Sequence, residues 1–244
     1  MIQSLKKLIK TLLDPYFWLC SKQEATTLLD AIQLNGPDNV LEFVSRYKGV
    51  GPYRKLAPLQ VKKEYLDLIT WAKSQGFRRI AEIGTAQGGT LVAWLTMQPQ
   101  QLISIDLPGG IHGGGYPPRK AALFHLLQQR ISPSTRLNLV RDDSHADSTF
   151  QHVKGLLNGD QLDFLLIDGD HRYEGVRRDF ELWAPLVRKG GFIAFHDVVP
   201  HKKVGNTCEV DRLWRELRNE YPDSFEIIAD REQGWAGIGI VPIH

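Results

Sequence analysis

Two aspartates stand directly after apolar segments that are typical of buried strands. Asp168 follows LDFLLI at 162–167, and Asp197 follows GGFIAFH at 190–196. Carboxylates at the ends of neighbouring strands can share one divalent cation, and magnesium on such ligands keeps open positions for water or for paired hydroxyl groups of a substrate. A cation held there would orient a substrate oxygen and lower its pKa. Alternatively, the two acids cap helices or accept hydrogen bonds from loop amides.

His171 lies three residues after Asp168, at the start of the next predicted helix. Its imidazole has an ordinary pKa of about 6.5 and can take up a proton near neutral pH. The spacing therefore predicts His171 as a general base and Asp168 as the second catalytic residue. His112 and His145 lie near the same strand ends and stay unassigned. Four further histidines are interpreted as surface or packing residues: His125, His152, His201 and His244.

A glycine turn follows a further apolar segment, in the run EIGTAQGGT at 82–90. Gly84 would let a ligand approach the backbone, and Gly88 and Gly89 open a helix whose amides favour a carboxylate or a phosphate. The run is neither G-x-G-x-x-G nor a P-loop, which argues against a nicotinamide or a nucleoside triphosphate. A tight turn without a ligand is the alternative.

Asp106 ends the next predicted strand, about twenty residues beyond the glycine turn, where an acid can accept hydrogen bonds from two ribose hydroxyls. The segment PGGIHGGGYPP at 108–118 follows it. Its glycines and prolines are equally compatible with a mobile flap over a ligand and with a flexible connector.

Seven short β-rich segments alternate with amphipathic stretches from residue 78 onward. The central segments are almost continuously apolar, as expected for parallel strands covered by helices on both faces. The predicted fold is therefore a doubly wound, Rossmann-like α/β sheet of seven strands. REQG at 231–234 is too short for a crossover helix, which predicts an antiparallel last strand. The strands are expected at 78–84, 101–107, 136–143, 162–169, 190–197, 224–230 and 235–243, and the helices at 90–97, 119–130, around 150–157, 174–187 and 209–221.

Residues 1–75 contain only helical patterns, which predicts an N-terminal helical segment that serves oligomerisation or covers the substrate, followed by a catalytic domain at 76–244. Helices are expected in the first fifteen residues, at 24–34, at 38–47 with Asp38 as the cap, and at 59–76. The first has an apolar stripe and a lysine-rich face, and Asp14 and Pro15 interrupt it before it could span a bilayer. It could lie on a membrane surface or pack on its own domain or a sister subunit. The stripe consists of Ile2, Leu5, Ile9, Leu12, Leu13 and Tyr16.

The composition is that of a globular protein without a nucleic-acid partner. Of the 244 residues, 42% are hydrophobic and 24% charged, and the net charge is +2. No long block of one sign is present that would follow a phosphate backbone. Cys20 and Cys208 match neither a zinc spacing nor a disulfide framework, which favours reduced thiols in a cytoplasmic protein.

Five segments in this order, AEIGTAQGGT, SIDLPGG, RDDSHAD, IDGDHRYEGVRRDF and FHDVVP, resemble a class I S-adenosylmethionine-dependent methyltransferase. More narrowly, they are similar to methyltransferase family 24, the group of cephalosporin hydroxylase-like proteins and macrocin-type O-methyltransferases. The resemblance covers roughly residue 60 to the C-terminus.

The resemblance implies a role for each segment. Glu82, Gly84, Thr85 and Gly88 would surround the methionine part of S-adenosylmethionine, Asp106 would bind its ribose, and Asp143 with Ser144 its adenine. A divalent cation, with magnesium as the first choice, would bind Asp168 and Asp197. Metal-dependent relatives often have a carboxylate where this chain has His196, which makes His196 a third candidate ligand.

The residues and the resemblance together predict an O-methyltransferase that acts on a hydroxyl group of a small molecule or glycan and is a homo-oligomer. Two alternatives stay open. One is a hydroxylase-like oxygenase with iron on Asp168, His196 and Asp197. The other is a non-catalytic assembly protein whose N-terminal helices mediate association.

Overall fold

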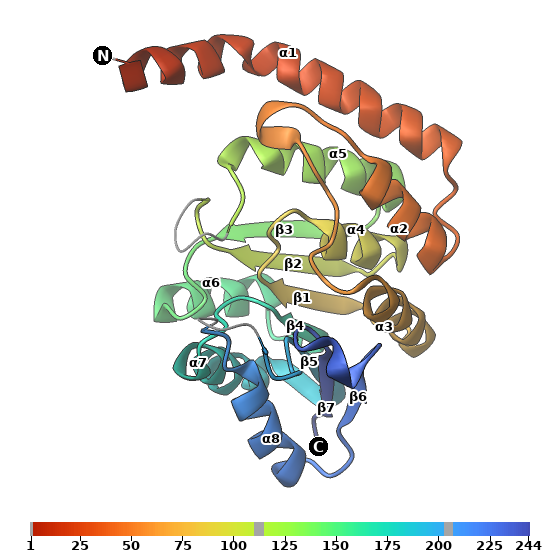
Figure 1. The fold of residues 1–244 in the computed structure, drawn as a ribbon, viewed down its shortest axis with the longest axis vertical. Helices are drawn as coiled ribbons and strands as arrows, with labels where there is room; N and C mark the ends of the chain where they lie inside the picture. Colours follow the sequence, from red (N-terminus) through yellow and green to blue (C-terminus); the bar gives the residue numbers. More distant parts are fainter. Residues whose placement is uncertain (1, 110–114, 203–206) are drawn as a thin grey trace.

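The computed structural model describes residues 2–109, 115–202 and 207–244, with side chains from residue 11 onward. Its centre is a seven-stranded sheet in the order β3-β2-β1-β4-β5-β7-β6 (Figure 1). β3, β2, β1, β4 and β5 run parallel, and β7 is antiparallel to both β5 and β6. The predicted seven-stranded α/β fold is thus confirmed. The strands are β1 Arg79–Ile83, β2 Gln101–Asp106, β3 Arg136–Arg141, β4 Leu162–Ile167, β5 Val187–His196, β6 Phe225–Ile227 and β7 Ile238–Pro242.

Helices cover both faces of the sheet, which explains why the central strands are apolar along their whole length. On one face Ile80 of β1 packs in a core with α3 Lys62–Gln75, α4 Gly89–Thr96 and α5 Ala121–Ile131. On the other face the next residue, Ala81, packs in a core with α6 Asp147–Leu157, α7 Tyr173–Trp183 and α8 Val210–Glu220. Successive residues of one strand therefore supply the two hydrophobic cores.

The register of the parallel strands brings their carboxyl ends to one level. Ile83 of β1 pairs with Ile105 of β2 and with Ile167 of β4. Ile167 in turn pairs with Phe195 of β5. The residues that follow these four positions consequently lie side by side at one edge of the sheet.

The antiparallel hairpin predicted from REQG is present, with β7 between β5 and β6. It is attached to α3 by Glu64, a fully buried acid. The Glu64 carboxylate accepts hydrogen bonds from the Ala229 and Gly237 amides, at 3.0 and 2.9 Å, and from Gln233 Nε2 at 2.7 Å. An N-terminal helix and the C-terminal hairpin are therefore joined by one buried side chain.

The N-terminal helices differ from the prediction in two places. α1 Ile2–Ala31 is a single helix of 30 residues that continues through Pro15, because its second half is anchored by the burial of Ala25 and Leu28, which outweighs the hydrogen bond that proline cannot make. α2 Pro37–Arg46 has Gly36 rather than Asp38 at its cap, since Pro37 is preorganised for the first helical position. α3 ends at Gly76 in the left-handed conformation, as predicted.

The described part of the α1 stripe does not pack on the body of the protein. Leu12, Leu13 and Tyr16 expose 70%, 43% and 61% of their surface, and α1 runs along the outside of α5 (Figure 1). The earlier members of the stripe, Ile2, Leu5 and Ile9, lie outside the residues whose side chains are described. Within the described chain, no helix combines the length and apolar character needed to cross a membrane.

Gly84 provides a test of the strand-end packing. Its φ is +92°, and a Cβ placed on it would overlap the backbone carbonyl oxygen of Asp168. We expect Gly84→Ala to lower the free energy of unfolding by about 3 kcal/mol or more, because both the backbone strain and the overlap must be relieved. Chemical denaturation of the two proteins measures the difference.

The matched control is Gly155→Ala in α6, where a Cβ meets no atom within 4 Å. This substitution should stabilise the protein by about 1 kcal/mol, because alanine is the better helix former. Equal effects of the two substitutions would contradict the packing described here.

Candidate active site

Four strand ends build the candidate site. Gly84, Asp168 and Asp197 follow β1, β4 and β5, and Asp106 ends β2, at the aligned edge of the sheet. The backbone ladder continues one step beyond the strands, because the Gly84 amide donates to Ile105 O at 2.9 Å and the Asp168 amide donates to Ile83 O at 2.8 Å. The glycine turn and the first of the two acids are therefore held together by main-chain contacts.

The two acids and two histidines form a compact cluster. His196 Nδ1 lies 3.1 Å from Asp168 Oδ1 and 3.6 Å from Asp197 Oδ1. His171 bridges the carboxylates from the other side, with Nε2 3.5 Å from Asp168 Oδ1 and Nδ1 3.3 Å from Asp197 Oδ2. Asp168, His196 and Asp197 each offer one ligand atom, and these atoms lie within 4.8 Å of one another. All four predicted members of this cluster are thus brought together.

The electrostatics of the cluster follow from burying two carboxylates. Burial alone would raise the pKa of Asp168, but the neighbouring His196 and His171 outweigh it and hold that pKa well below its usual range. Burial lowers the pKa of His196, yet Asp168 and Asp197 raise it to about 9. A hydrogen bond to Asp168, helped by the charge of Asp197, likewise raises the pKa of His171. Positive charge on the imidazoles compensates the two carboxylates.

Asp197 adopts a backbone conformation that is rare for a residue with a side chain, with φ at +65°. Its Oδ1 accepts a hydrogen bond from the Ala236 amide at 3.1 Å. Such strain persists only where the surroundings fix it, and it is concentrated at functional sites. Asp197 is therefore held in place by its backbone conformation and by the Ala236 amide, which precedes β7.

The sequence pattern missed two residues of the site. His201, interpreted as a surface or packing residue, has its Nε2 3.2 Å from Asp197 Oδ1 and so contacts the cluster. Its position four residues after Asp197 was the available signal, by the same reasoning that selected His171 after Asp168. Gln60 Nε2 donates to Asp168 Oδ2 at 2.6 Å. Nothing in the local pattern indicates a contact across 108 residues of chain.

Cys208 also lies beside this cluster. One ligand atom each from His171, Asp197 and Cys208 falls within the same 4.8 Å limit. Burial raises the pKa of its thiol to about 12, which favours the protonated form. Cys208 and Cys20 form no disulfide with each other, in agreement with the predicted reduced thiols.

Glu82 and Thr85, predicted to border a cofactor's methionine part, lie beneath the glycine turn. Glu82 is fully buried and accepts a hydrogen bond from Trp94 Nε1 at 2.8 Å. Burial raises its pKa to about 7, and the hydroxyls and N–H around it offset this only in part. The Thr85 hydroxyl is 2.5 Å from that of Ser104 on β2. The Glu82 side chain is thus tied to α4, and the Thr85 side chain to β2.

Gly88 starts α4 with φ at +89°, and a Cβ there would overlap the ring of Phe124. The glycine requirement at this position thus comes from helix packing within the protein. The predicted ribose acid, Asp106, is 7% exposed. Its Oδ2 accepts from the Ala86 amide at 2.7 Å and its Oδ1 from the Leu107 amide at 2.8 Å. The carboxylate is therefore fixed in orientation at the start of the glycine turn.

The predicted adenine residues follow β3. Asp143 is exposed, and its Oδ1 accepts from the His145 amide at 2.9 Å. The Ser144 carbonyl accepts from the buried Trp183 Nε1 at 3.0 Å. His145, unassigned from the sequence, lies 3.4 Å from the fully buried carboxylate of Asp179, which raises the pKa of His145. His112 and the middle of the glycine-rich segment 108–118 lie outside the described residues.

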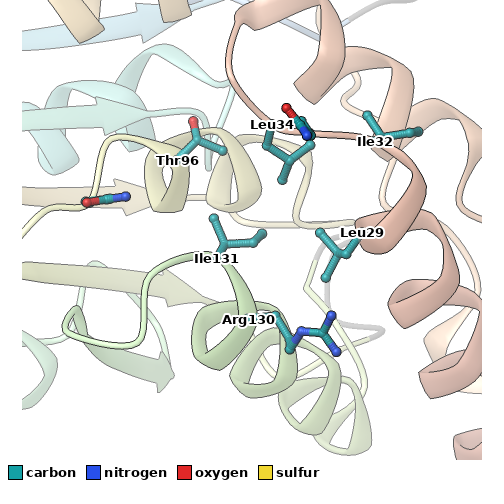
Figure 2. Close-up of a pocket in the computed structure, with 8 residues that line it drawn as sticks. Leu29, Ile32, Leu34, Thr96, Arg130 and Ile131 are labelled. Atoms are coloured by element: carbon teal, nitrogen blue, oxygen red, sulfur yellow. The ribbon is translucent and has the colours of Figure 1, made fainter.

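A pocket of about 250 Å³ lies at the opposite end of the sheet (Figure 2). Leu29, Leu34, Thr96 and Ile131 line it where α4 and α5 end, next to the amino ends of β2 and β3. Its charged member, Arg130, is paired with Asp30 at 2.5 Å. This pocket offers packing surface and none of the acid–histidine chemistry of the strand ends.

About half of the chain is similar in sequence to known proteins. Residues 81–198, just under half of the chain, match a family model described as a methyltransferase domain. An uncharacterized protein, R132 of Acanthamoeba polyphaga mimivirus, is 37% identical over 120 residues, which are 48% of this chain and 49% of that protein. The chain therefore spans about half the length of this curated relative.

Two solved structures share the fold over most of the chain. An O-methyltransferase from Bacillus cereus in complex with SAH has a TM-score of 0.55 and 17% identity, covering 93% of this chain and 99% of its own. The O-methyltransferase TomG from Streptomyces achromogenes, involved in tomaymycin synthesis and solved with SAM, has a TM-score of 0.52 and 15% identity, covering 92% and 90%. At these identities the likeness establishes the methyltransferase fold.

Glu82 gives a pH-dependent prediction for the unliganded protein. A carboxyl group whose pKa rises from an ordinary value of 4.5 to about 7 on folding stabilises the fold fully below pH 4.5 and loses that contribution as the pH rises through 7. Glu82→Gln keeps an acceptor for Trp94 and removes the titration. We expect the variant to gain about 2 kcal/mol relative to the wild type between pH 5 and pH 8, measured by denaturation at both pH values.

Glu42→Gln on the exposed surface of α2 is the control and should change by less than about 0.5 kcal/mol over the same interval. A constant difference between Glu82→Gln and the wild type at both pH values would show that Glu82 does not titrate in this range.

Proposed function

We infer that the chain transfers a methyl group from S-adenosylmethionine to a hydroxyl group of a small molecule or glycan, because residues 81–198 match a family model described as a methyltransferase domain. The observation that carries the proposal is the position of His171 between Asp168 and Asp197, at the strand ends that also carry the glycine turn. A base, two cation ligands and a cofactor turn are the components that this reaction needs.

The proposed cofactor site uses the predicted residues. The methionine part would lie beside Glu82, Gly84, Thr85 and Gly88, the ribose at Asp106, and the adenine at Asp143 and Ser144. The fixed orientation of the Asp106 carboxylate supports the ribose assignment, because both oxygens are already aligned by backbone amides and retain lone pairs for hydroxyl donors.

The donor set fits a divalent cation. Two buried carboxylates and an imidazole converge within 4.8 Å, and the carboxylates raise the pKa of both His196 and His171. We propose Asp168, His196 and Asp197 as ligands. The carboxylates suit magnesium or manganese, and the imidazole would suit iron. When bound, the cation supplies Lewis-acid stabilisation of a substrate alkoxide.

His171 would accept the proton of the substrate hydroxyl. Its side chain is 44% exposed, so a substrate can reach it, while both ring nitrogens face carboxylates. A cation on Asp168 and Asp197 would weaken the effect by which these carboxylates raise the pKa of His171.

In the transfer itself, the substrate oxygen bonds to the methyl carbon while the carbon–sulfur bond breaks and its electron pair stays on sulfur. The products are a methyl ether and S-adenosylhomocysteine. The rate gain is expected to come largely from holding the oxygen in line with the methyl group.

His196 and His201 favour a second candidate function, that of a metal-dependent oxygenase on the same fold. Both imidazoles lie within 3.6 Å of an Asp197 oxygen, and histidine–carboxylate sets with open positions bind iron in oxygenases. Metal analysis of protein purified without added ions, combined with an assay of methyl consumption, separates the two candidates.

The N-terminal segment 1–75 is proposed to serve association. The exposed apolar residues Leu12, Tyr16 and Leu19 on α1 would pair with a second subunit in a homo-oligomer or contact a membrane surface weakly. A non-catalytic assembly protein, the third alternative, requires that purified protein transfer no methyl group to any acceptor.

His171→Ala tests the base. We expect methyl transfer to fall by about 10²- to 10⁴-fold while the affinity for S-adenosylhomocysteine stays within about threefold, because His171 would contact the substrate hydroxyl and not the cofactor's binding groups. Tritiated S-adenosylmethionine with a panel of vicinal dihydroxyphenols and hexose glycosides measures turnover. His152→Ala, at an exposed position on α6, is the control. Full turnover by His171→Ala would overturn the assignment.

Asp168→Asn tests the cation site. Loss of one of two carboxylates should weaken manganese binding at least tenfold, or about 1.4 kcal/mol, as measured by electron paramagnetic resonance of free Mn²⁺ during titration. Asp223→Asn, an exposed acid after α8, should bind like the wild type. Unchanged manganese affinity in Asp168→Asn would exclude this site.

A further inference from the structure

The segment that links the first helices to α3 lies across the start of α4. A Cβ on Gly89 would fall 2.6 Å from Pro58 N and 2.7 Å from Leu56 O. The Tyr65 hydroxyl, from α3, donates to Gly89 O at 2.7 Å. The linking segment 55–61 therefore packs directly on the helix start that follows the glycine turn.

Both ends of this segment are fixed. At its beginning, the Lys120 ammonium donates to Lys55 O at 2.7 Å, and Leu56 is fully buried. At its end, Gln60 Nε2 donates to Asp168 Oδ2 at 2.6 Å. The N-terminal part of the chain thus supplies one wall of the candidate active site and places Gln60 inside it.

The hydrogen bond to Asp168 determines which way the Gln60 amide faces. A carboxylate only accepts, so the NH₂ group must point to Asp168 and the carbonyl oxygen Oε1 must point away from it. Oε1 is buried and has no hydrogen-bond partner among the described residues. A buried acceptor without a donor costs about 1–3 kcal/mol, and such groups in native proteins call for an explanation such as a bound ligand.

The chemistry around Oε1 selects the donor. The proposed function brings the methionine part of S-adenosylmethionine to the glycine turn, where Gly84 meets the Asp168 backbone. At the amino-acid end of that part, the carboxylate only accepts hydrogen bonds, whereas the ammonium carries three N–H donors. The ammonium is therefore the group that a buried acceptor next to Asp168 suits.

We propose that Gln60 is a cofactor-binding residue whose Oε1 accepts a hydrogen bond from the ammonium group of S-adenosylmethionine, while its Nε2 orients Asp168. This assignment rests on the proposed function. It gives the segment before α3 a specific role, since a residue outside the matched methyltransferase domain at 81–198 completes the cofactor site.

Calorimetry with two ligands tests the assignment. S-adenosylhomocysteine is compared with its analogue in which hydrogen replaces the amino group, on the wild type and on Gln60→Met, which has a similar shape and no hydrogen-bonding groups. We expect Gln60→Met to bind S-adenosylhomocysteine about tenfold more weakly than the wild type, and the analogue within twofold of it. Gln75→Met, at an exposed position in the last turn of α3, should leave both affinities unchanged.

Equal weakening of both ligands by Gln60→Met would overturn the assignment, because it indicates a structural effect. Binding of both ligands by the wild type with equal affinity would also overturn it and leave the methyltransferase proposal standing. Failure of the wild type to bind S-adenosylhomocysteine at all would instead contradict the proposed function.

Gln60→Glu provides the second variant if Gln60→Met does not fold. Glutamate keeps an acceptor oxygen and lacks the NH₂ group, so this variant should still prefer S-adenosylhomocysteine over the analogue by at least tenfold. Loss of that preference in folded Gln60→Glu would overturn the proposal.

Discussion

The site depends on one constraint: the carboxyl ends of four parallel strands are aligned with one another. The register of β1, β2, β4 and β5 aligns Ile83, Ile105, Ile167 and Phe195. The residues after these positions are therefore neighbours because of the strand pairing alone. The backbone of Gly84 lies so close to Asp168 that no side chain fits between them. A shift of one strand by a single residue would turn the side chains of that strand to the other face and remove its residue from the site.

Buried carboxylates at this edge of the sheet need nearby positive charge or hydrogen-bond donors, and the histidines of the cluster provide them. Asp168 and Asp197 are both largely buried, and each is surrounded by donors: His196 and His171 share them, and His201 adds a third imidazole. The same negative charge that raises the pKa of His196 and His171 makes the site attractive to a cation. Stability of the unliganded state and affinity for positively charged ligands therefore have the same origin.

The sequence was most informative where local pattern and chemistry coincide. Continuous apolar segments predict the parallel strands, and the acids that end them predict the cluster of Asp168, His171 and Asp197, because strand ends meet by topology. The sequence pattern did not predict features that depend on tertiary contacts. α1 continues through Pro15 because its second half is anchored, and Gln60 reaches Asp168 from 108 residues away. No periodicity or spacing encodes such a contact, whereas His201 could have been found from its distance to Asp197 along the chain.

The most direct test of the account is a crystal structure with S-adenosylhomocysteine and Mn²⁺, read from the anomalous signal of manganese. The account predicts one manganese peak coordinated by carboxylate oxygens of both Asp168 and Asp197, with the cofactor sulfur next to the same strand ends. A peak elsewhere, or a cofactor bound away from the glycine turn, would contradict the claim that aligned strand ends assemble one active site.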